Sequence, residues 1–198
     1  MRKITFIINP ISGTKKKKEI PGLIHTILKD SDWEFEIVNT RYAGHATEIA
    51  TEKAQQGVDV VVAVGGDGTV NEVASALVHT NTALGIIPCG SGNGLARHLG
   101  VPMSRLKAIE LFLNGGIQQM DYGIINGKQL FFCSCGVGFD ALVSWEFAHA
   151  GKRGLMTYCS IALKENFKYK PETYTLKTDT GEGLTNKAFV IACGNAAQ

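Results

Sequence analysis

Long apolar runs are absent from this 198-residue sequence. The longest clear one reaches only from Val58 to Val64 and contains Asp59, whereas a helix that crosses a bilayer needs about 20 apolar residues. We therefore expect no transmembrane segment. The N-terminus has a charged start, but its apolar stretch is too short for a signal peptide and no small-residue cleavage site follows. We expect a cytoplasmic protein.

The sequence also lacks an excess of one charge and a metal-binding cysteine pattern. Lys and Arg number 20 against 18 Asp and Glu, and a net charge of +2 is too balanced to indicate a nucleic-acid binder. The five cysteines are odd in number and include no Cys-x-x-Cys or Cys/His zinc spacing. We interpret them as reduced core cysteines. Cys133 and Cys135 alternate in an apolar run and should share one face of a strand.

The first part of the chain alternates between strand-like and helix-like patterns. Lys3 to Asn9 and Val58 to Val64 are apolar runs of the kind that predict buried strands, and amphipathic segments such as Glu19 to Lys29 separate the runs. This alternation is typical of a parallel α/β sheet. From Ile117 the pattern changes to short strands with helical segments near 141–150 and 155–167, which predicts an α+β region. The strand-like segments there are 120–125, 129–135, 173–178 and 188–193. We expect two domains, residues 1–117 and 118–198.

The chain stops at Gly194 to Gln198, directly after the last predicted strand. A strand-to-loop transition is an unusual place for a domain to end, because it leaves a sheet edge exposed. We therefore expect a truncated chain whose second domain is incomplete.

The strongest chemical signal is the segment Gly65 to Val73, GGDGTVNEV, which follows the buried strand. Its glycines allow backbone N–H groups to approach an anion, and the helix predicted to begin near Val70 offers its positive end. Asp67 would repel a phosphate unless a metal or a proton transfer is involved, so it is a candidate Mg²⁺-linked residue or general base; a simple turn role is the alternative. Thr69 and Glu72 also fit a helix capping box.

Two further glycine loops follow other predicted strands. They are Asn9 to Gly13, NPISG, and Pro88 to Gly94, PCGSGNG. Because the carboxyl ends of parallel strands meet at one edge of a sheet, the three loops should converge on a single site. No GxxxxGK[ST] segment occurs, so the pattern is not that of a P-loop enzyme.

These loops resemble the diacylglycerol kinase catalytic-domain family, which includes bacterial lipid kinases and sphingosine kinases. The matching segments are NPISG, TRYAGHA at Thr40 to Ala46, GGDGTVNEV, PCGSGNGLARHLG at Pro88 to Gly100, and DYG at Asp121 to Gly123. GGDGT alone is shared with NAD kinases and phosphofructokinases. The other segments favour the lipid-kinase branch, and the resemblance covers essentially the whole chain.

The resemblance implies an α/β domain of the NAD kinase and diacylglycerol kinase type, followed by a strand-rich lipid-binding domain. It implies ATP, Mg²⁺ and transfer of the γ-phosphate to a hydroxyl of a diacylglycerol-like or long-chain-base lipid at the membrane surface. Asp67 would be catalytic, Asp121 matches an acidic position near the metal, and Asp140 matches a position that faces the lipid head group. The implied nucleotide contacts are Asn9, Ser12, Gly13, Thr40, Gly66, Gly68, Thr69, Asn71 and Ser91.

Several alternatives remain open. An NAD kinase-like enzyme, or a nucleotide-binding regulator without turnover, would use the same loops. The Lys15–Lys18 run is typical of a solvated loop but could also meet phosphates or anionic lipid. The basic, aromatic stretch from Lys152 to Lys170 fits either a membrane-surface helix or an ordinary amphipathic helix. A homodimer is a further possibility. We expect the 198-residue chain to bind ATP without appreciable lipid phosphorylation.

Overall fold

The computed structural model describes residues 1–11, 15–151, 154–181 and 183–196. The chain divides into two compact units. Unit 1 contains residues 1–133 and 195–198, and unit 2 contains residues 134–194. The prediction of two folding domains, residues 1–117 and 118–198, stays a prediction.

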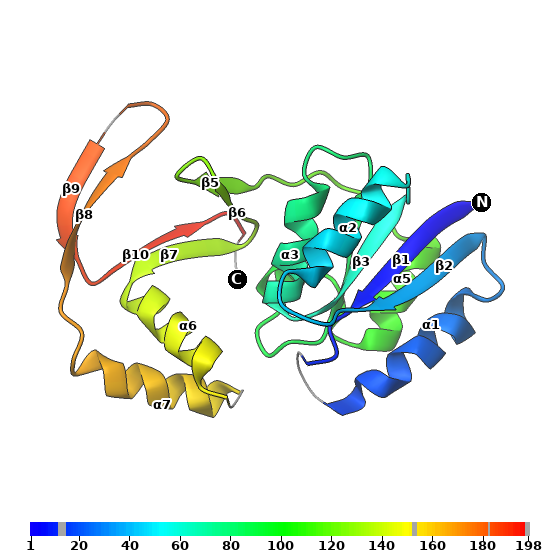
Figure 1. The fold of residues 1–198 in the computed structure, drawn as a ribbon, viewed down its shortest axis with the longest axis horizontal. Helices are drawn as coiled ribbons and strands as arrows, with labels where there is room; N and C mark the ends of the chain where they lie inside the picture. Colours follow the sequence, from blue (N-terminus) through cyan, green and yellow to red (C-terminus); the bar gives the residue numbers. More distant parts are fainter. Residues whose placement is uncertain (12–14, 152–153, 182, 197–198) are drawn as a thin grey trace. The chain divides into compact units, whose positions relative to one another are not determined.

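Unit 1 is built on a parallel sheet of four strands, as the alternating sequence pattern predicted (Figure 1). The order across the sheet is β2-β1-β3-β4. These strands are β1 (Arg2–Ile8), β2 (Trp33–Asn39), β3 (Val60–Gly65) and β4 (Ala83–Pro88). Every residue of β3 is buried, because helices cover both faces of the sheet there.

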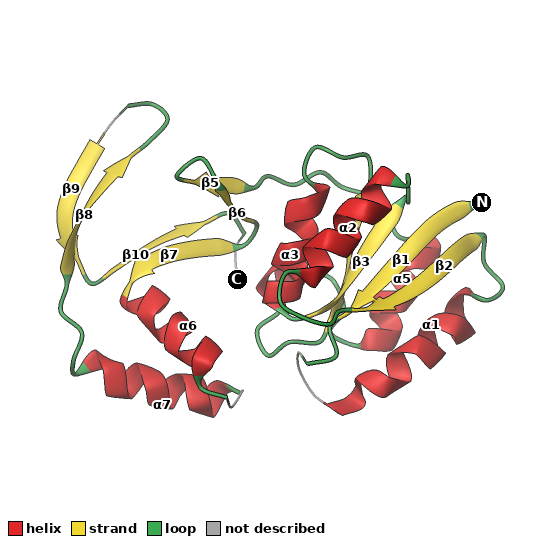
Figure 2. Cartoon of the chain, viewed as in Figure 1, coloured by secondary structure: helices red, strands yellow, loops and turns green. Residues whose placement is uncertain are grey.

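Helices pack on both faces of this sheet (Figure 2). They are α1 (Ile20–Leu28), α2 (His45–Gln55), α3 (Asp67–Leu77), α4 (Gly94–His98) and α5 (Arg105–Asn114), with the 3₁₀ helix η1 (Lys15–Glu19) before α1. Val61 and Ala63 of β3 join one core with α2 and α3. Val60, Val62 and Val64 point the other way and join a second core with α1 and α5. The alternation of side chains along one strand thus builds both layers.

A short antiparallel pair, β5 (Gly123–Ile125) and β6 (Gln129–Phe131), follows the helices of unit 1. The predicted strand at 129–135 is wrong in one respect, because the chain leaves extended pairing at Phe132 and Cys133. The carbonyl of Cys133 accepts the N–H groups of Asn195 and Ala196 at 2.8 and 3.0 Å. The side chain of Asn195 also donates to the carbonyl of Phe132 at 2.9 Å. These bonds hold the bend where unit 2 begins.

Unit 2 combines two antiparallel strand pairs with two helices. The strands β7 (Ser134–Gly138) and β10 (Val190–Gly194) pair with each other, and so do β8 (Glu172–Lys177) and β9 (Gly183–Ala188). The helices α6 (Phe139–His149) and α7 (Leu155–Asn166) lie between β7 and β8 in the chain. The sequence prediction missed β9, whose polar residues Thr185, Asn186 and Lys187 give no apolar alternation. Among the described residues, no helix has both the length and the apolar character that a bilayer span requires.

Candidate active site

The carboxyl ends of the four parallel strands of unit 1 bring the three glycine loops to one edge of the sheet. Ile8 at the end of β1 pairs with Asn39 of β2 on one side and with Val64 of β3 on the other. Gly65 at the end of β3 pairs with Pro88 at the end of β4. The segments that follow these residues therefore start next to one another, as the sequence predicted.

The first loop is tied directly to the GGDGT segment. The N–H of Asn9 donates to the carbonyl of Val64 at 3.1 Å, and its side-chain Nδ2 donates to Oγ1 of Thr69, also at 3.1 Å. Thr69 is buried. The predicted helix start near Val70, with Thr69 as a cap, is wrong: α3 begins at Asp67 and Gly66 is its N-cap. The Thr69 hydroxyl instead connects two loops.

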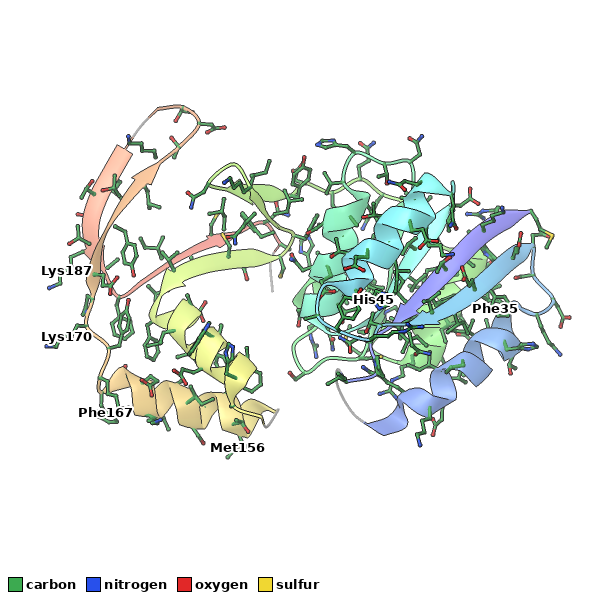
Figure 3. All side chains as sticks on the ribbon, viewed as in Figure 1. Phe35, His45, Met156, Phe167, Lys170 and Lys187 are labelled. Atoms are coloured by element: carbon green, nitrogen blue, oxygen red, sulfur yellow. The ribbon has the colours of Figure 1, made fainter. Side chains whose placement is uncertain are left out.

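The loop after β2 reaches the same edge. The N–H of Thr40, a buried residue, donates to the carbonyl of Ile8 at 2.9 Å. His45 begins α2 (Figure 3), and its Nδ1 accepts the N–H of Arg41 at 3.1 Å while its ring stacks on Tyr42 with centroids 4.5 Å apart.

Asp67 binds the start of α4 with both oxygens of its carboxylate. Oδ1 accepts the N–H of Gly94 at 2.7 Å, and Oδ2 accepts the N–H of Asn93 at 2.9 Å. These N–H groups lie at the start of α4, where helix N–H groups have no partner within the helix. The negative charge of Asp67 thus joins the GGDGT segment to the loop after β4. Each oxygen retains a second lone pair for a further ligand.

Two glycines let these two loops touch. A Cβ atom on Gly90 would lie 2.6 Å from the Cα of Gly66, and a Cβ on Gly66 would lie 3.1 Å from the Cα of Gly90. Any side chain at Gly90 would therefore meet backbone atoms, which cannot rotate away. The residues directly before these glycines are also joined, because Cys89 donates its N–H to the carbonyl of Gly65 at 2.7 Å.

The first turn of α3 fits a phosphate group. Its N-cap residue is Gly66, which has no side chain to accept a hydrogen bond from the first turn, so the N–H groups there and the positive helix end can face an anion. Thr69, in the first turn, is buried, whereas Gly68 in the same turn and Asn71 one turn further on are exposed.

The donor set for Mg²⁺ is sparse but suitable. Within the described part of the chain, no three His, Cys, Asp or Glu side chains cluster so as to hold a metal. Mg²⁺ is usually bound by one or two carboxylates together with phosphate oxygens and waters. Asp67 beside a phosphate on α3 would satisfy that arrangement.

Sequence reasoning missed the role of Lys17. The interpretation of the lysine run as a solvated loop is wrong for this residue, which is buried and donates from Nζ to the carbonyl of Asn9. Burial lowers the pKa of Lys17; the nearby Cys89 acts in the opposite direction, and Arg105 adds to the lowering. Lys17 therefore places an amine next to Asn9, the first residue of the first loop. Lys18, the next residue of the same 3₁₀ helix, is exposed, so the two neighbouring lysines differ in burial although the sequence gives them the same pattern.

Asn93 is a second residue that the sequence analysis did not single out. It adopts a left-handed backbone conformation, with φ of 57°. Its side chain accepts the N–H of Gly90 at 2.8 Å and donates to the carbonyl of Gly90 at 2.9 Å. The preference of asparagine for this conformation was a usable signal. Ser91 is exposed in the loop that Asn93 closes, on the wall of a cavity of about 520 Å³ that Arg97 and Arg105 also line.

Four predicted site residues are not placed in this constellation by the described contacts of unit 1. Asp121 belongs to unit 1 but lines a separate cavity of about 1070 Å³, together with His79 and Tyr122, whose side chains share a hydrogen bond of 3.0 Å. Asp140 belongs to unit 2, where its Oδ1 accepts the hydroxyl of Tyr158 at 3.2 Å. Ser12 and Gly13 lie outside the described residues.

The contact between the glycine loops generates a matched pair of variants. We expect Gly90→Ala to lower the free energy of unfolding by about 1–3 kcal/mol, because its methyl group overpacks against Gly66. Gly68→Ala meets nothing within 4 Å in helix α3, so we expect no loss, or a gain of about 0.5–1 kcal/mol. Urea denaturation followed by circular dichroism measures both. Equal stability of the two variants would contradict the proposed contact.

Comparison with known proteins gives a consistent family assignment. Residues 3–125 match the family profile "Diacylglycerol kinase catalytic domain". "Diacylglycerol kinase" of Bacillus subtilis (strain 168) is 36% identical over 131 residues, which are 65% of this chain and 43% of that protein. "Probable lipid kinase YegS-like" of Enterobacter sp. (strain 638) is 32% identical over 196 residues, which are 95% of this chain and 64% of that protein.

A solved structure shares the fold. The crystal structure of a diacylglycerol kinase from Bacillus anthracis str. Sterne matches with a TM-score of 0.72 and 28% identity, over 98% of this chain and 64% of that one. The chain thus spans between 43% and 64% of the length of these relatives. Because the family profile matches more than half of the chain, the chain belongs to the diacylglycerol kinase catalytic domain family.

Proposed function

We propose that this edge of unit 1 binds ATP with Mg²⁺, and that the protein transfers the γ-phosphate to a hydroxyl of a diacylglycerol-like or long-chain-base lipid. The observation that carries the proposal is the pair of hydrogen bonds from Asn93 and Gly94 to the carboxylate of Asp67. They hold two glycine loops together beside the uncapped first turn of α3. Family membership supports the kinase class.

The residues of the loops would act mainly by positioning and by neutralising charge. Phosphoryl transfer depends chiefly on these two effects. The N–H groups of Gly68 and Thr69 would face phosphate oxygens, and Asn9 would hold Thr69 in place through its hydrogen bond. Mg²⁺, when bound, would neutralise the charge that develops on the phosphate oxygens. Asp67 would hold it, or would accept the proton of the lipid hydroxyl.

The other predicted roles extend this proposal. Thr40, Gly66, Asn71 and Ser91 would contact the nucleotide, since each follows a strand or lies on α3 at the same edge. Asp121 would be a metal-linked residue, and Asp140 in unit 2 would contact the lipid head group. The hydroxyl of Tyr158 orients the Asp140 carboxylate. A homodimer stays a prediction.

One side of α7 supports a location at the membrane surface. Met156, Leu163 and Phe167 are spaced by seven and four residues, which places them on the same side of a helix. They are 79%, 66% and 87% exposed. Figure 3 shows Met156 on the side of α7 that points away from α6. Exposed apolar side chains in a row are a typical means of insertion into a lipid interface.

Positive charge lies beside this apolar row. Lys164 and Lys168 are exposed and share Glu165, whose side chain is mostly covered. Lys170 follows and is also exposed. Three lysines against one glutamate complement an anionic bilayer, so we propose that the protein docks on anionic lipid from the cytoplasm. None of the five cysteines, all of which are described, forms a disulfide.

Substitution of Asp67 tests the proposed chemistry. In Asp67→Asn the amide can accept only one of the two N–H groups, and the negative charge is lost. We expect phosphoryl transfer to a lipid to fall by at least about 10²-fold, the usual scale for a group that handles protons or a metal. ATP affinity should fall less than about tenfold, because only one hydrogen bond is lost. Transfer is followed with radiolabelled ATP in the protein expressed to its natural stop codon, and affinity by calorimetry on residues 1–198.

Asp59→Asn is the matched control. Oδ2 of Asp59 also accepts a backbone N–H, that of Lys3 at 2.6 Å, but it precedes β3 and lies at the opposite edge of the sheet. We expect normal transfer and affinity in this variant. Near-normal transfer in Asp67→Asn, or label that enters NAD rather than diacylglycerol or long-chain bases, would contradict the proposal.

Vesicle binding tests the apolar row on α7 separately. We expect the double variant Leu163→Ser/Phe167→Ser to bind vesicles of phosphatidylglycerol and phosphatidylcholine at least about tenfold more weakly, because each buried apolar side chain contributes about 1.5 kcal/mol or more. Ile117→Ser is the control, since Ile117 is 73% exposed but lies in unit 1. Co-sedimentation measures the partition coefficient. Equal binding of the double variant and the wild type would show that α7 does not dock.

A further inference from the structure

Two cysteines of unit 2 face each other across a strand pair. Cys135 of β7 is the register partner of Cys193 of β10 in an antiparallel pair. Directly opposite residues in such a pair point to the same face of the sheet, with Cβ atoms about 4.5–5.5 Å apart. The two thiols are therefore neighbours, although α6, α7, β8 and β9 separate them in the chain.

The hydrogen-bond pattern fixes the kind of pair they form. Phe139 donates its N–H to the carbonyl of Phe189 at 2.9 Å. Hydrogen-bonded pairs recur at every second residue, so Cys135 and Cys193, four residues further along each strand, also form such a pair. Its Cα atoms lie about 5.5 Å apart, within the range that disulfides span.

The two thiols differ in accessibility. Cys193 is exposed, whereas Cys135 is partly covered. Burial raises the pKa of the Cys135 thiol, and the adjacent Cys193 raises it further. An oxidant in solution therefore meets Cys193 first and finds Cys135 beside it as a protonated thiol. Of the other cysteines, Cys89 is buried in unit 1 and Cys159 is exposed on α7.

We propose that Cys135 and Cys193 form a dithiol site that a hydroperoxide converts into a disulfide. The Cys193 thiolate attacks the peroxide, the O–O bond breaks, and a sulfenic acid forms while the leaving oxygen departs as water or an alcohol. The sulfur of Cys135 then attacks that of Cys193. The S–O bond breaks, the S–S bond forms, and the hydroxyl leaves with the Cys135 proton as water. Two thiols are oxidised and one peroxide is reduced.

The disulfide would join the first and last strands of unit 2, since β7 begins the unit and β10 ends it. It would thus close nearly the whole unit into one covalent loop. The Cβ atoms start slightly further apart than the ~3.5–4.5 Å of most disulfides, so closure requires a small shift of the strands. A bond with such strain is easily reduced, which makes the change reversible.

Mass spectrometry of the peroxide-treated chain tests this inference. After treatment, the remaining thiols are alkylated in denaturant and the chain is cut with trypsin. We expect two of the five cysteines to escape alkylation, and the peptides 129–152 and 188–198 to be linked until a reductant is added. Full alkylation at Cys135 and Cys193 after peroxide treatment would overturn the proposal.

Variants identify which sulfur in the first peptide takes part, because peptide 129–152 also contains Cys133. We expect Cys133→Ser and Cys159→Ser to retain the link and Cys135→Ser to lose it. A link that persists in Cys135→Ser, or that disappears in Cys133→Ser, would assign the reaction to a different pair. The wild-type measurement does not depend on the folding of any variant.

Discussion

The candidate site depends on one interaction, the pair of hydrogen bonds that the Asp67 carboxylate accepts from the N–H groups of Asn93 and Gly94. Those groups would have no partner within α4, because they stand at its start. A carboxylate is the side chain that can accept from both and also complement the positive helix end. The turn after β3 and the loop after β4 are therefore held as one structure, and the charge of Asp67 is fixed between them.

The other features of this edge of the sheet depend on the close approach of the glycine loops to one another. Gly66 and Gly90 leave no room for a side chain between them, and Asn93 takes a left-handed conformation to close the second loop. Asn9 connects the first loop to Thr69. The result is a set of backbone N–H groups around an uncapped helix start, which suits a group rich in negative oxygens. The chain belongs to the diacylglycerol kinase catalytic domain family, and we propose that this group is the phosphate chain of a nucleotide.

The sequence was sufficient where periodic patterns or glycine loops carry the structure. The buried run that became β3, and the convergence of three loops at the strand ends, follow from apolar alternation and parallel pairing. Single residues set by tertiary contacts could not be predicted in this way. The buried Lys17 donates a hydrogen bond to the carbonyl of Asn9, a contact that the lysine run does not reveal. Strand β9 pairs with β8 although its sequence is polar. The break at Cys133 depends on Asn195, which returns to unit 1 after the whole of unit 2 in the chain.

Amide NMR of residues 1–198 during titration with ATP and Mg²⁺ tests the central claim most directly. The account predicts that the largest shift changes occur at the N–H groups of residues 66–69 and 90–94, because these surround the uncapped turn of α3. Changes that gather instead at His79 and Tyr122, in the cavity of about 1070 Å³, with the glycine loops unaffected, would contradict it.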